Sequence, residues 1–329
     1  MQCLKPYCQS DKKEIGQLFD KYGFHYSLVV HPRSLFSVYG NSRVIRPTKR
    51  LERMLEKLRK LIEAGPFRAA KDLRLLSELG VNVFFAEDVS KILSDGREPT
   101  LYDIPCRDLT NERIVVYTAL TGNYDHVHEI LYKQPNVDYL LFTNNKSLKS
   151  TTWDVRYVDS RLDNLLLSRE IKMFPHKYLS KVYTSSIYID ANALIYGDIG
   201  ELCGFLEAGT TMAVTTHYAR NSIKDEIKAC VECGRIKDDV DAMAQYDGYL
   251  KEGFRDDMGL AECTILIRRH NDFALQRLME EWWKEFCSGV KRDQFSLLPC
   301  VHRLSFKGFR LVPGVVWFNQ YVFIGRHKS

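Results

Sequence analysis

Apolar runs and amphipathic stretches alternate along the chain from residue 113 onward. Near-continuous apolar runs are typical of strands that are buried on both faces of a sheet. Strands are expected at RIVVYTAL from Arg113, YLLFT from Tyr139, WDVRYVD from Trp153, the run that ends at Ile189, Met212–Thr216 and CTILIRR from Cys263. Helical patterns separate them, at 127–132, 168–181, 223–233 and around Trp282. This alternation predicts an α/β fold, a Rossmann-like and mostly parallel sheet flanked by helices.

The first part of the chain has a different sequence pattern, which predicts short amphipathic helices and few strands. Apolar residues recur at helical spacing from Leu51 to Ile62, and Gly65-Pro66 ends that helix. A second helix is expected at 67–79 and a strand at 81–86. We therefore divide the chain into a smaller N-terminal accessory region, α/β or mainly helical, at 1–110 and a main domain at 111–329. The first helix has a basic face interspersed with glutamates, which indicates a solvated surface or a contact with an anionic membrane or a biosynthetic complex.

Polar residues follow several of the expected strands directly. In such sheets ligands bind at the carboxyl ends of the strands. The apolar run of Ile187–Ile189 stops at Asp190, and Asn192 stands two residues later, before a second short apolar run. An acid fixed at the end of a buried strand is costly unless a cation meets it. Carboxylate and amide oxygens suit Mg²⁺ or Mn²⁺, and the alternative is a capped turn.

Other candidate groups lie before and after this strand end. Lys172, His176 and Lys177 precede it on a basic stretch that would bind a diphosphate or form a solvated face. Asp293 and Gln294 follow a Trp-bearing helix. Asp293 is expected to be either a catalytic carboxylate, with Gln294 beside it, or the cap of a helix. Three further polar residues stand near strand ends, namely His217, Arg220 and Glu262. The pair Cys230 and Cys233 has no second pair at zinc spacing and is expected to be structural.

Composition narrows the classes of function. The 329 residues are 45% hydrophobic and 27% charged, and the formal net charge is +5. These values fit a globular protein with an anionic ligand such as a nucleotide diphosphate, and no nucleic-acid partner is expected. No apolar run approaches the ~20 residues of a membrane span. The nine scattered cysteines and the polar start predict a cytoplasmic protein, or one peripheral at the inner face of the membrane.

Five motifs in order carry a resemblance to a known family. They are RIVVYTALTGNYD, FPHKYLSKVYTSSIYIDANALI, THYARNSIKDE, MGLAECTILIRRHND and WWKEFCSGVKRDQFSL. From about Arg113 the chain resembles the glycosyltransferase-like domain of plants and bacteria that was formerly catalogued as a domain of unknown function. Its plant members are linked to polysaccharide and mucilage synthesis. That family in turn resembles glycosyltransferases of the A-type fold, and above all their retaining group.

The resemblance implies a site for a nucleotide-sugar. Asp190 and Asn192 match the Asp-x-Asp strand end that holds Mn²⁺ in the retaining group, and Asp293-Gln294 matches a segment that faces the donor sugar. A histidine near the C-terminus completes that metal site. His327 is the first candidate for this histidine and His302 the second.

These residues together predict metal-assisted, retaining transfer of a sugar to a glycan, a lipid-linked acceptor or another hydroxyl. Glu262 would contact the hydroxyls of the donor sugar. The donor would also contact the loop after the first strand of the sheet, with Thr118, Leu120, Thr121, Gly122 and Asp125. Two alternatives stay open, a metal-assisted hydrolase and a non-catalytic module that binds carbohydrate or a partner.

Overall fold

The computed structural model describes residues 26–30, 81–85 and 102–324, with gaps at 106, 124, 126, 129, 131–132, 196, 317–318 and 320. The chain divides into two units, Met1–Glu98 and Pro99–Ser329. In the first unit, β1 (Tyr26–Val30) pairs antiparallel with β2 (Val81–Phe85), where the sequence predicted a strand. The helices expected at 51–62 and 67–79 lie outside the described residues.

The second unit is built on a seven-stranded sheet in the order β10-β8-β9-β6-β3-β4-β5. All neighbouring strands pair parallel except β9, which runs antiparallel to both β6 and β8. The strands are β3 (Ile114–Ala119), β4 (Val137–Thr143), β5 (Asp154–Tyr157), β6 (Ser185–Ile189), β8 (Met212–Thr216), β9 (Ala261–Arg268) and β10 (Phe309–Val312). Because β9 is reversed, its first residues lie at the edge where the parallel strands end.

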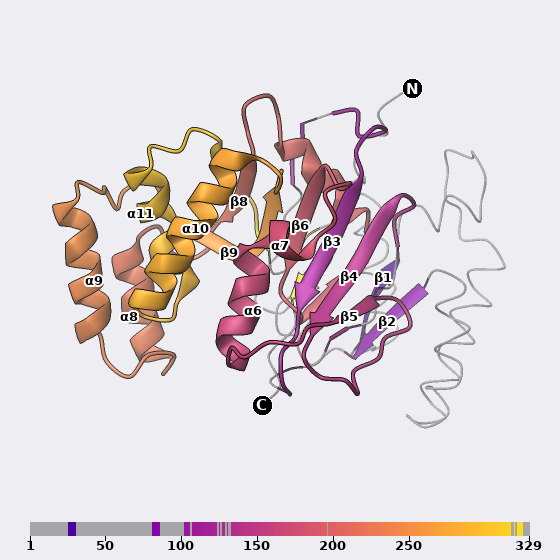
Figure 1. The fold of residues 1–329 in the computed structure, drawn as a ribbon, viewed down its shortest axis with the longest axis horizontal. Coiled ribbons are helices and arrows are strands. Elements are labelled where there is room, and N and C mark those ends of the chain that lie inside the picture. The colour runs from indigo at the N-terminus through magenta and orange to yellow at the C-terminus, as the bar shows by residue number, and fades with distance from the viewer. Residues whose placement is uncertain are drawn as a thin grey trace. The chain divides into compact units, whose positions relative to one another are not determined.

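Helices cover one face of this sheet, and several begin at side-chain caps. Asp163 accepts a hydrogen bond from Leu166 N at 2.8 Å at the start of α6, and Asp272 does the same for Leu275 N, also at 2.8 Å, at the start of α10. The helices are α6 (Asn164–Met173), α7 (Pro175–Tyr178), α8 (Ile223–Glu232), α9 (Val240–Lys251), α10 (Phe273–Ser288) and α11 (Asp293–Arg303). Figure 1 shows α6 and α10 in front of the sheet.

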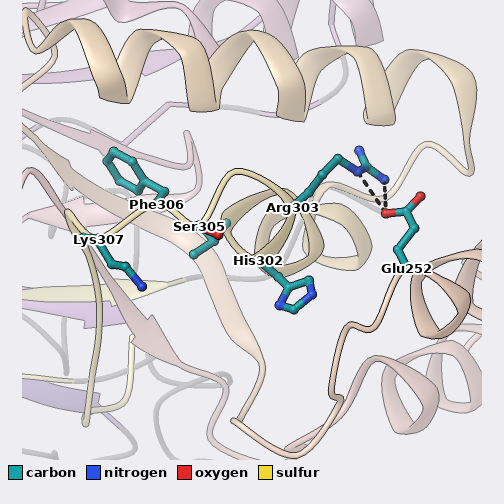
Figure 2. A pocket seen from close by; sticks show the side chains of 7 residues that line it. Glu252, His302, Arg303, Ser305, Phe306 and Lys307 are labelled. Carbon is teal, nitrogen blue, oxygen red and sulfur yellow. Dashed lines mark hydrogen bonds and ion pairs between the residues drawn. The ribbon is translucent and has the colours of Figure 1, made fainter.

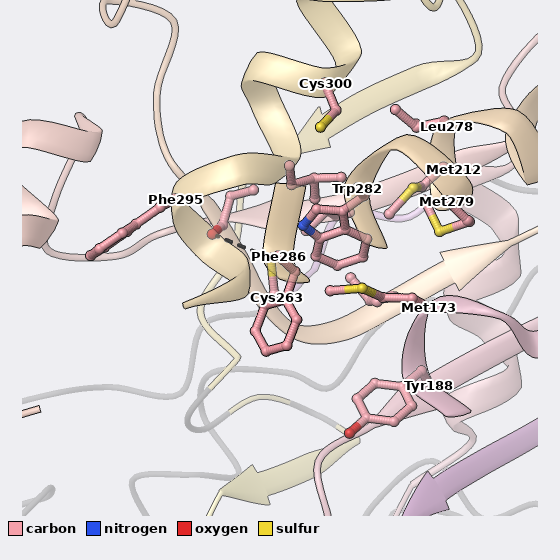
Figure 3. Close-up of a cluster of buried hydrophobic side chains, with 14 of the residues drawn as sticks. Met173, Tyr188, Met212, Cys263, Leu278, Met279, Trp282, Phe286, Phe295 and Cys300 are labelled. Carbon is pink, nitrogen blue, oxygen red and sulfur yellow. Dashed lines mark hydrogen bonds between the residues drawn. The ribbon is translucent and has the colours of Figure 1, made fainter. Parts of the chain in front are cut away.

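Each face of the sheet has its own hydrophobic core. The helix-side core joins Tyr117 and Tyr188 of the strands to Trp282 and Phe286 of α10, all at most 1% exposed. Figure 3 shows Tyr188, Trp282 and Phe286 in this core. The opposite core contains the 3₁₀ helix η1 (Ile199–Phe205) and the antiparallel pair β7 (Ala193–Ile195) and β11 (Val322–Ile324). The turn between β6 and β7 therefore leads from the sheet into the opposite core.

The predicted α/β fold class is confirmed, with a mixed, mostly parallel sheet flanked by helices. Met212–Thr216 forms β8 with the expected bounds. Two helical expectations were wrong in detail. The stretch 168–181 is broken at Phe174, where α6 ends and Pro175 begins α7. Of the stretch 127–132, the described residues Val127, His128 and Ile130 are not helical.

Candidate functional site

Two carboxylates from distant parts of the chain meet one buried lysine at the carboxyl edge of the sheet. Asp190 follows β6, and Asp293 is the first residue of α11. Lys172, near the end of α6, places its Nζ 2.6 Å from Asp293 Oδ2 and 3.7 Å from Asp190 Oδ1. The lysine side chain is 2% exposed, whereas Asp190 is 31% exposed. The lysine therefore joins the two acids, and the Asp190 side opens to solvent.

Opposing charges keep Asp293 ionised in spite of its burial. Burial alone would raise the pKa of this carboxyl, but the positive charges of Lys172, Arg169 and Arg292 outweigh that effect and hold the pKa well below its usual range. Arg169 Nε lies 3.5 Å from Asp293 Oδ2. Burial would lower the pKa of Arg169, and Asp293 instead raises it above its ordinary value. Asp293 is thus a permanent carboxylate and is unsuited to donate a proton.

A closed ring of six side chains lies beside this cluster, and we call it the polar ring. Arg220 and Arg292 both pair with the buried Glu226, the second at 3.5 Å. Contacts of 2.7–3.4 Å continue around the ring, from Arg292 to Gln294, Gln294 to Glu262, Glu262 to His217 and His217 to Arg220. The ring joins the end of β8, the start of β9, α8 and the start of α11.

Glu262 and His217 have opposite pKa shifts. Burial raises the pKa of Glu262 to about 7, and a hydrogen bond from Thr264 opposes the shift. Burial and the charge of Arg220 lower the pKa of His217 to about 4. Backbone amides of Ala219 and Arg220 donate to His217 Nδ1, each at 3.1 Å, and the Arg220 guanidinium faces the other ring nitrogen. Because His217 stays neutral near pH 7, Glu262 is the side chain of the ring suited to exchange a proton there.

The loop after β3 is fixed by asparagine side chains. Asn144 Oδ1 accepts from Gly122 N at 2.8 Å, and Thr121 Oγ1 donates to the Asn164 carbonyl at 2.6 Å. Gly122 has φ +64°, and a Cβ there would lie 2.4 Å from Asn164 Nδ2. The loop is therefore held against the start of α6. Asn144, which follows β4, and Asn164, at the start of α6, contact this loop, and no sequence motif indicated them.

The other residues expected in this loop have less accessible side chains. Thr118 and Leu120 are 0% and 5% exposed, and Leu120 belongs to the core opposite the helices. Asp125 is 9% exposed. Their side chains support the loop, and Gly122 and its asparagine partners form its surface.

Two expected donor ligands lie away from Asp190. Lys177 is 49% exposed and pairs with Glu170 at 3.5 Å. Burial and the charge of Lys177 lower the pKa of His176, whose other charged neighbours are Glu280 and Arg268. Arg268 pairs in register with Ser186, at the start of β6. The structure thus places His176 toward the opposite edge of the sheet, because the break at Phe174 turns α7 away from α6.

His302 lies in a separate pocket of about 750 Å³, beside Glu252, Arg303 and Lys307 (Figure 2). It is nine residues beyond Asp293 on α11, which separates the two by roughly 14 Å at ~1.5 Å per residue. Arg303 is held there by ion pairs with Glu252, Glu281 and Glu285. This pocket is therefore distinct from the cluster around Lys172.

Two side-chain oxygens of the kind that hold Mg²⁺ or Mn²⁺ stand in the turn after β6. Asp190 offers a partly exposed carboxylate, and Asn192 brings a buried amide oxygen within the same turn. The cluster has a formal charge of zero, because the two acids Asp190 and Asp293 balance the two bases Lys172 and Arg169. The negative charge of a bound diphosphate would therefore need a further cation. No group of three or more His, Cys, Asp or Glu that could hold a metal occurs among the described residues.

His327, the third expected metal ligand, lies outside the described residues. In the sequence it stands three residues after β11, whose Ile324 pairs with Ala193 next to Asn192.

Within the part of the chain that the structure describes, no helix combines the length and apolarity that a membrane span needs.

A glycosyltransferase is among the solved structures to which this chain is similar. No protein-family model matches the chain, and no curated protein matches it. The apo structure of the WbbM bifunctional glycosyltransferase is similar with a TM-score of 0.34 and 10% identity, over 63% of this chain and 40% of that chain. A likeness to a glycosyltransferase at this level carries no argument about activity, and the family that the five motifs resemble stays a prediction.

Proposed function

We propose that this chain transfers a sugar from a nucleotide-sugar donor to a hydroxyl acceptor. One observation carries the proposal: Lys172 unites Asp190 and Asp293 at the carboxyl edge of the sheet, with Asp190 open to solvent. Ligands of open α/β sheets bind at this edge. The loop after β3, with Gly122 and its asparagine partners, ends at the same edge and would hold the nucleoside.

The diphosphate of the donor would lie at the turn of Asp190 and Asn192. A divalent cation held by these two residues would neutralise the negative charge that grows on the departing diphosphate. Lys172 does not reach solvent, so its part is to fix both carboxylates. Arg169, with a side chain that is 24% exposed, is placed to meet the phosphate oxygens.

Asp293 would act on the sugar by its charge. Glycosyl transfer builds positive charge at the anomeric carbon, and a carboxylate that stays ionised stabilises this charge without taking a proton. Gln294, the next residue, donates to Glu262 at 3.4 Å and thereby links Asp293 to the polar ring. Retention of configuration belongs to the proposal through the resemblance of Asp293-Gln294 to the retaining group.

Thermal stability in the presence of donors tests the proposal. Chelator-treated protein is mixed with UDP-, GDP- and ADP-sugars, each with and without Mn²⁺. A donor at one hundred times its Kd stabilises by ~2.7 kcal/mol, which for a unit of this size raises the melting temperature by roughly 5–10 °C. Asp190→Ala, folded by circular dichroism, should lose this shift. If no donor raises the melting temperature with or without metal, donor binding is refuted.

Mass spectrometry of the same mixtures separates the alternatives. Sugar transfer releases a nucleoside diphosphate in step with a glycosylated acceptor. A hydrolase would release product without any nucleotide, and a binding module would show the thermal shift with no turnover.

A further inference from the structure

Two arginines of the polar ring keep terminal N–H groups that no protein acceptor uses. Arg220 Nε pairs with Glu226 Oε2, and its Nη2 faces His217 Nε2 at 2.7 Å. Arg292 uses its Nη2 for Gln294 Oε1 and Glu226 Oε1. Among the described residues, the Nη1 of each arginine has no hydrogen-bond partner, and neither Nη1 is buried from solvent. The two side chains are 24% and 20% exposed, so both Nη1 groups are open to a ligand.

A fully buried acid holds the two guanidinium groups in place. Glu226 is 0% exposed and pairs with Arg220 through one carboxylate oxygen and with Arg292 through the other. It lies in the first turn of α8, where the Ser222 side chain caps the helix and accepts from Asp225 N at 3.1 Å. The guanidinium groups are therefore fixed before a ligand arrives, and a ligand that contacts both pays little for ordering them.

The polar ring has more positive than negative charge near pH 7. Its two arginines carry two positive charges and Glu226 one negative charge, and Glu262 is only partly ionised because burial raises its pKa to about 7. Burial, the charge of Arg220 and the charge of the exposed Arg235 lower the pKa of His217, so a third positive charge lies near the ring. The ring therefore favours an anion over a neutral or cationic ligand. Guanidinium groups bind carboxylates and phosphates through paired hydrogen bonds.

The order of the strands separates these arginines from the expected diphosphate site. Across the sheet, the loop of Gly122 follows β3, Asp190 follows β6, and the polar ring lies at the start of the reversed β9 and the end of β8. His217 directly follows β8, and Glu262 is the second residue of β9. β8 is two strand spacings from β6, roughly 10 Å. A donor with its nucleoside at β3 and its diphosphate at β6 leaves the polar ring to the group beyond the transferred sugar, which is the acceptor.

We propose that Arg220 and Arg292 form an anion subsite for the acceptor, in which their Nη1 groups donate to a carboxylate or phosphate group that the acceptor carries. The acceptor is then an acidic saccharide or a saccharide phosphate, and a neutral glycan is a poor substrate. The proposal rests on the proposed function, because that function assigns the diphosphate of the donor to Asp190 and leaves this subsite to the acceptor.

Saturation-transfer NMR with matched ligands tests the subsite on the full chain. Methyl glucuronoside and methyl glucoside share one ring and differ in a single carboxylate, and glucose 6-phosphate supplies the phosphate group. Each is titrated with and without Mg²⁺ and the nucleoside diphosphate that binds best. At least one of the two anions should bind at least about tenfold more tightly than methyl glucoside, since tenfold corresponds to ~1.4 kcal/mol, near the lower end for a hydrogen bond to a charged group. The anion that binds more tightly shows whether the subsite takes a carboxylate or a phosphate.

Arginine-to-lysine variants separate the subsite from the fold. Arg292→Lys keeps a positive charge beside Glu226 but has no Nη1, and should raise the Kd of the anion about tenfold. Arg220→Lys should do the same, and replaces the first variant if circular dichroism shows that the first is unfolded. Arg310→Lys is the matched control, because Arg310 is a partly exposed arginine that pairs with Glu207 near the start of β10, away from the carboxyl edge. Its Kd for the anion should equal that of the wild type.

The remaining outcomes contradict either the subsite or the proposed function. The subsite is overturned if methyl glucoside binds as tightly as both anions, or if the folded lysine variants bind the anions as tightly as the wild type. It is also overturned if the nucleoside diphosphate displaces the anion, because the two arginines then belong to the diphosphate site. If the nucleoside diphosphate does not bind while an anion binds through Arg292, the proposed function fails and the anion site stands.

Discussion

Replacing Lys172 with methionine tests whether this lysine is the centre of the site. Its side chain is 2% exposed, and its Nζ lies 2.6 Å from Asp293 Oδ2. Removing one partner of a buried ion pair costs ~3–5 kcal/mol because the other charge stays buried. Arg169 remains 3.5 Å from the same oxygen, so we expect the lower value, about 3 kcal/mol. For a unit of this size that loss lowers the melting temperature by roughly 6–12 °C.

The loss of stability in Lys172→Met should be smaller at acidic pH. In the wild type the folded pKa of Asp293 is below the unfolded value, so its pairing stabilises fully above the usual aspartate range and is lost only as the pH falls through the folded pKa. In Lys172→Met the buried carboxylate has lost its nearest cation, and burial then favours the protonated form. The difference in melting temperature between wild type and variant should therefore be larger near pH 7 than near pH 4.

Calorimetry of four proteins checks this reasoning. Lys177→Met removes a lysine that is 49% exposed and should cost less than about 0.5 kcal/mol. In Lys172→Met/Asp293→Asn the unpaired charge is gone, so the double variant should recover ~1–2 kcal/mol relative to the single one. The reasoning is refuted if Lys172→Met is as stable as Lys177→Met, or if its defect is the same at both pH values.

Three further changes have defined outcomes. Asn192→Asp adds a charge to the expected metal ligands and should tighten Mn²⁺ binding by at least about tenfold in calorimetric titration; unchanged affinity would remove Asn192 from the metal site. Glu262 has a folded pKa of about 7, above its unfolded value, so its burial costs stability as the pH rises from the unfolded to the folded pKa. The melting temperature of Glu262→Gln relative to wild type should rise over that interval, and a flat difference would contradict the shift. Gly122→Ala places a Cβ 2.4 Å from Asn164 Nδ2 at φ +64°, and should cost at least ~1–2 kcal/mol in denaturant unfolding; wild-type stability would contradict the fixed loop.

The sequence predicted the strand end at Asp190 because burial leaves a clear pattern. β3, β6 and β9 are buried at every position, and each appears in the sequence as a short apolar run. The α/β fold class followed from their alternation with helices. β10 and β11 have only four and three residues, and their places in the sheets depend on pairing with distant segments.

The partners of the charged residues could not be predicted from local spacing. Lys172 and Lys177 stand in one basic stretch, yet the first is buried between two acids and the second is half exposed. What separates them is the helix break at Phe174 and the arrival of Asp293 from far along the chain. Arg292 directly precedes Asp293 in the sequence, and its pairing with Glu226 depends on how α8 packs beside α11.

Release of nucleoside diphosphate in a donor screen tests the central claim most directly. Wild type and Asp190→Ala are incubated with the nucleotide-sugar panel, Mn²⁺ and a mixture of disaccharide acceptors, and nucleoside diphosphate and glycosylated product are quantified by mass spectrometry. We predict that at least one donor gives the two products in equal amounts with the wild type, and that Asp190→Ala, with an unchanged fold, gives neither. Equal turnover by the two proteins would contradict the assignment of the site at the end of β6.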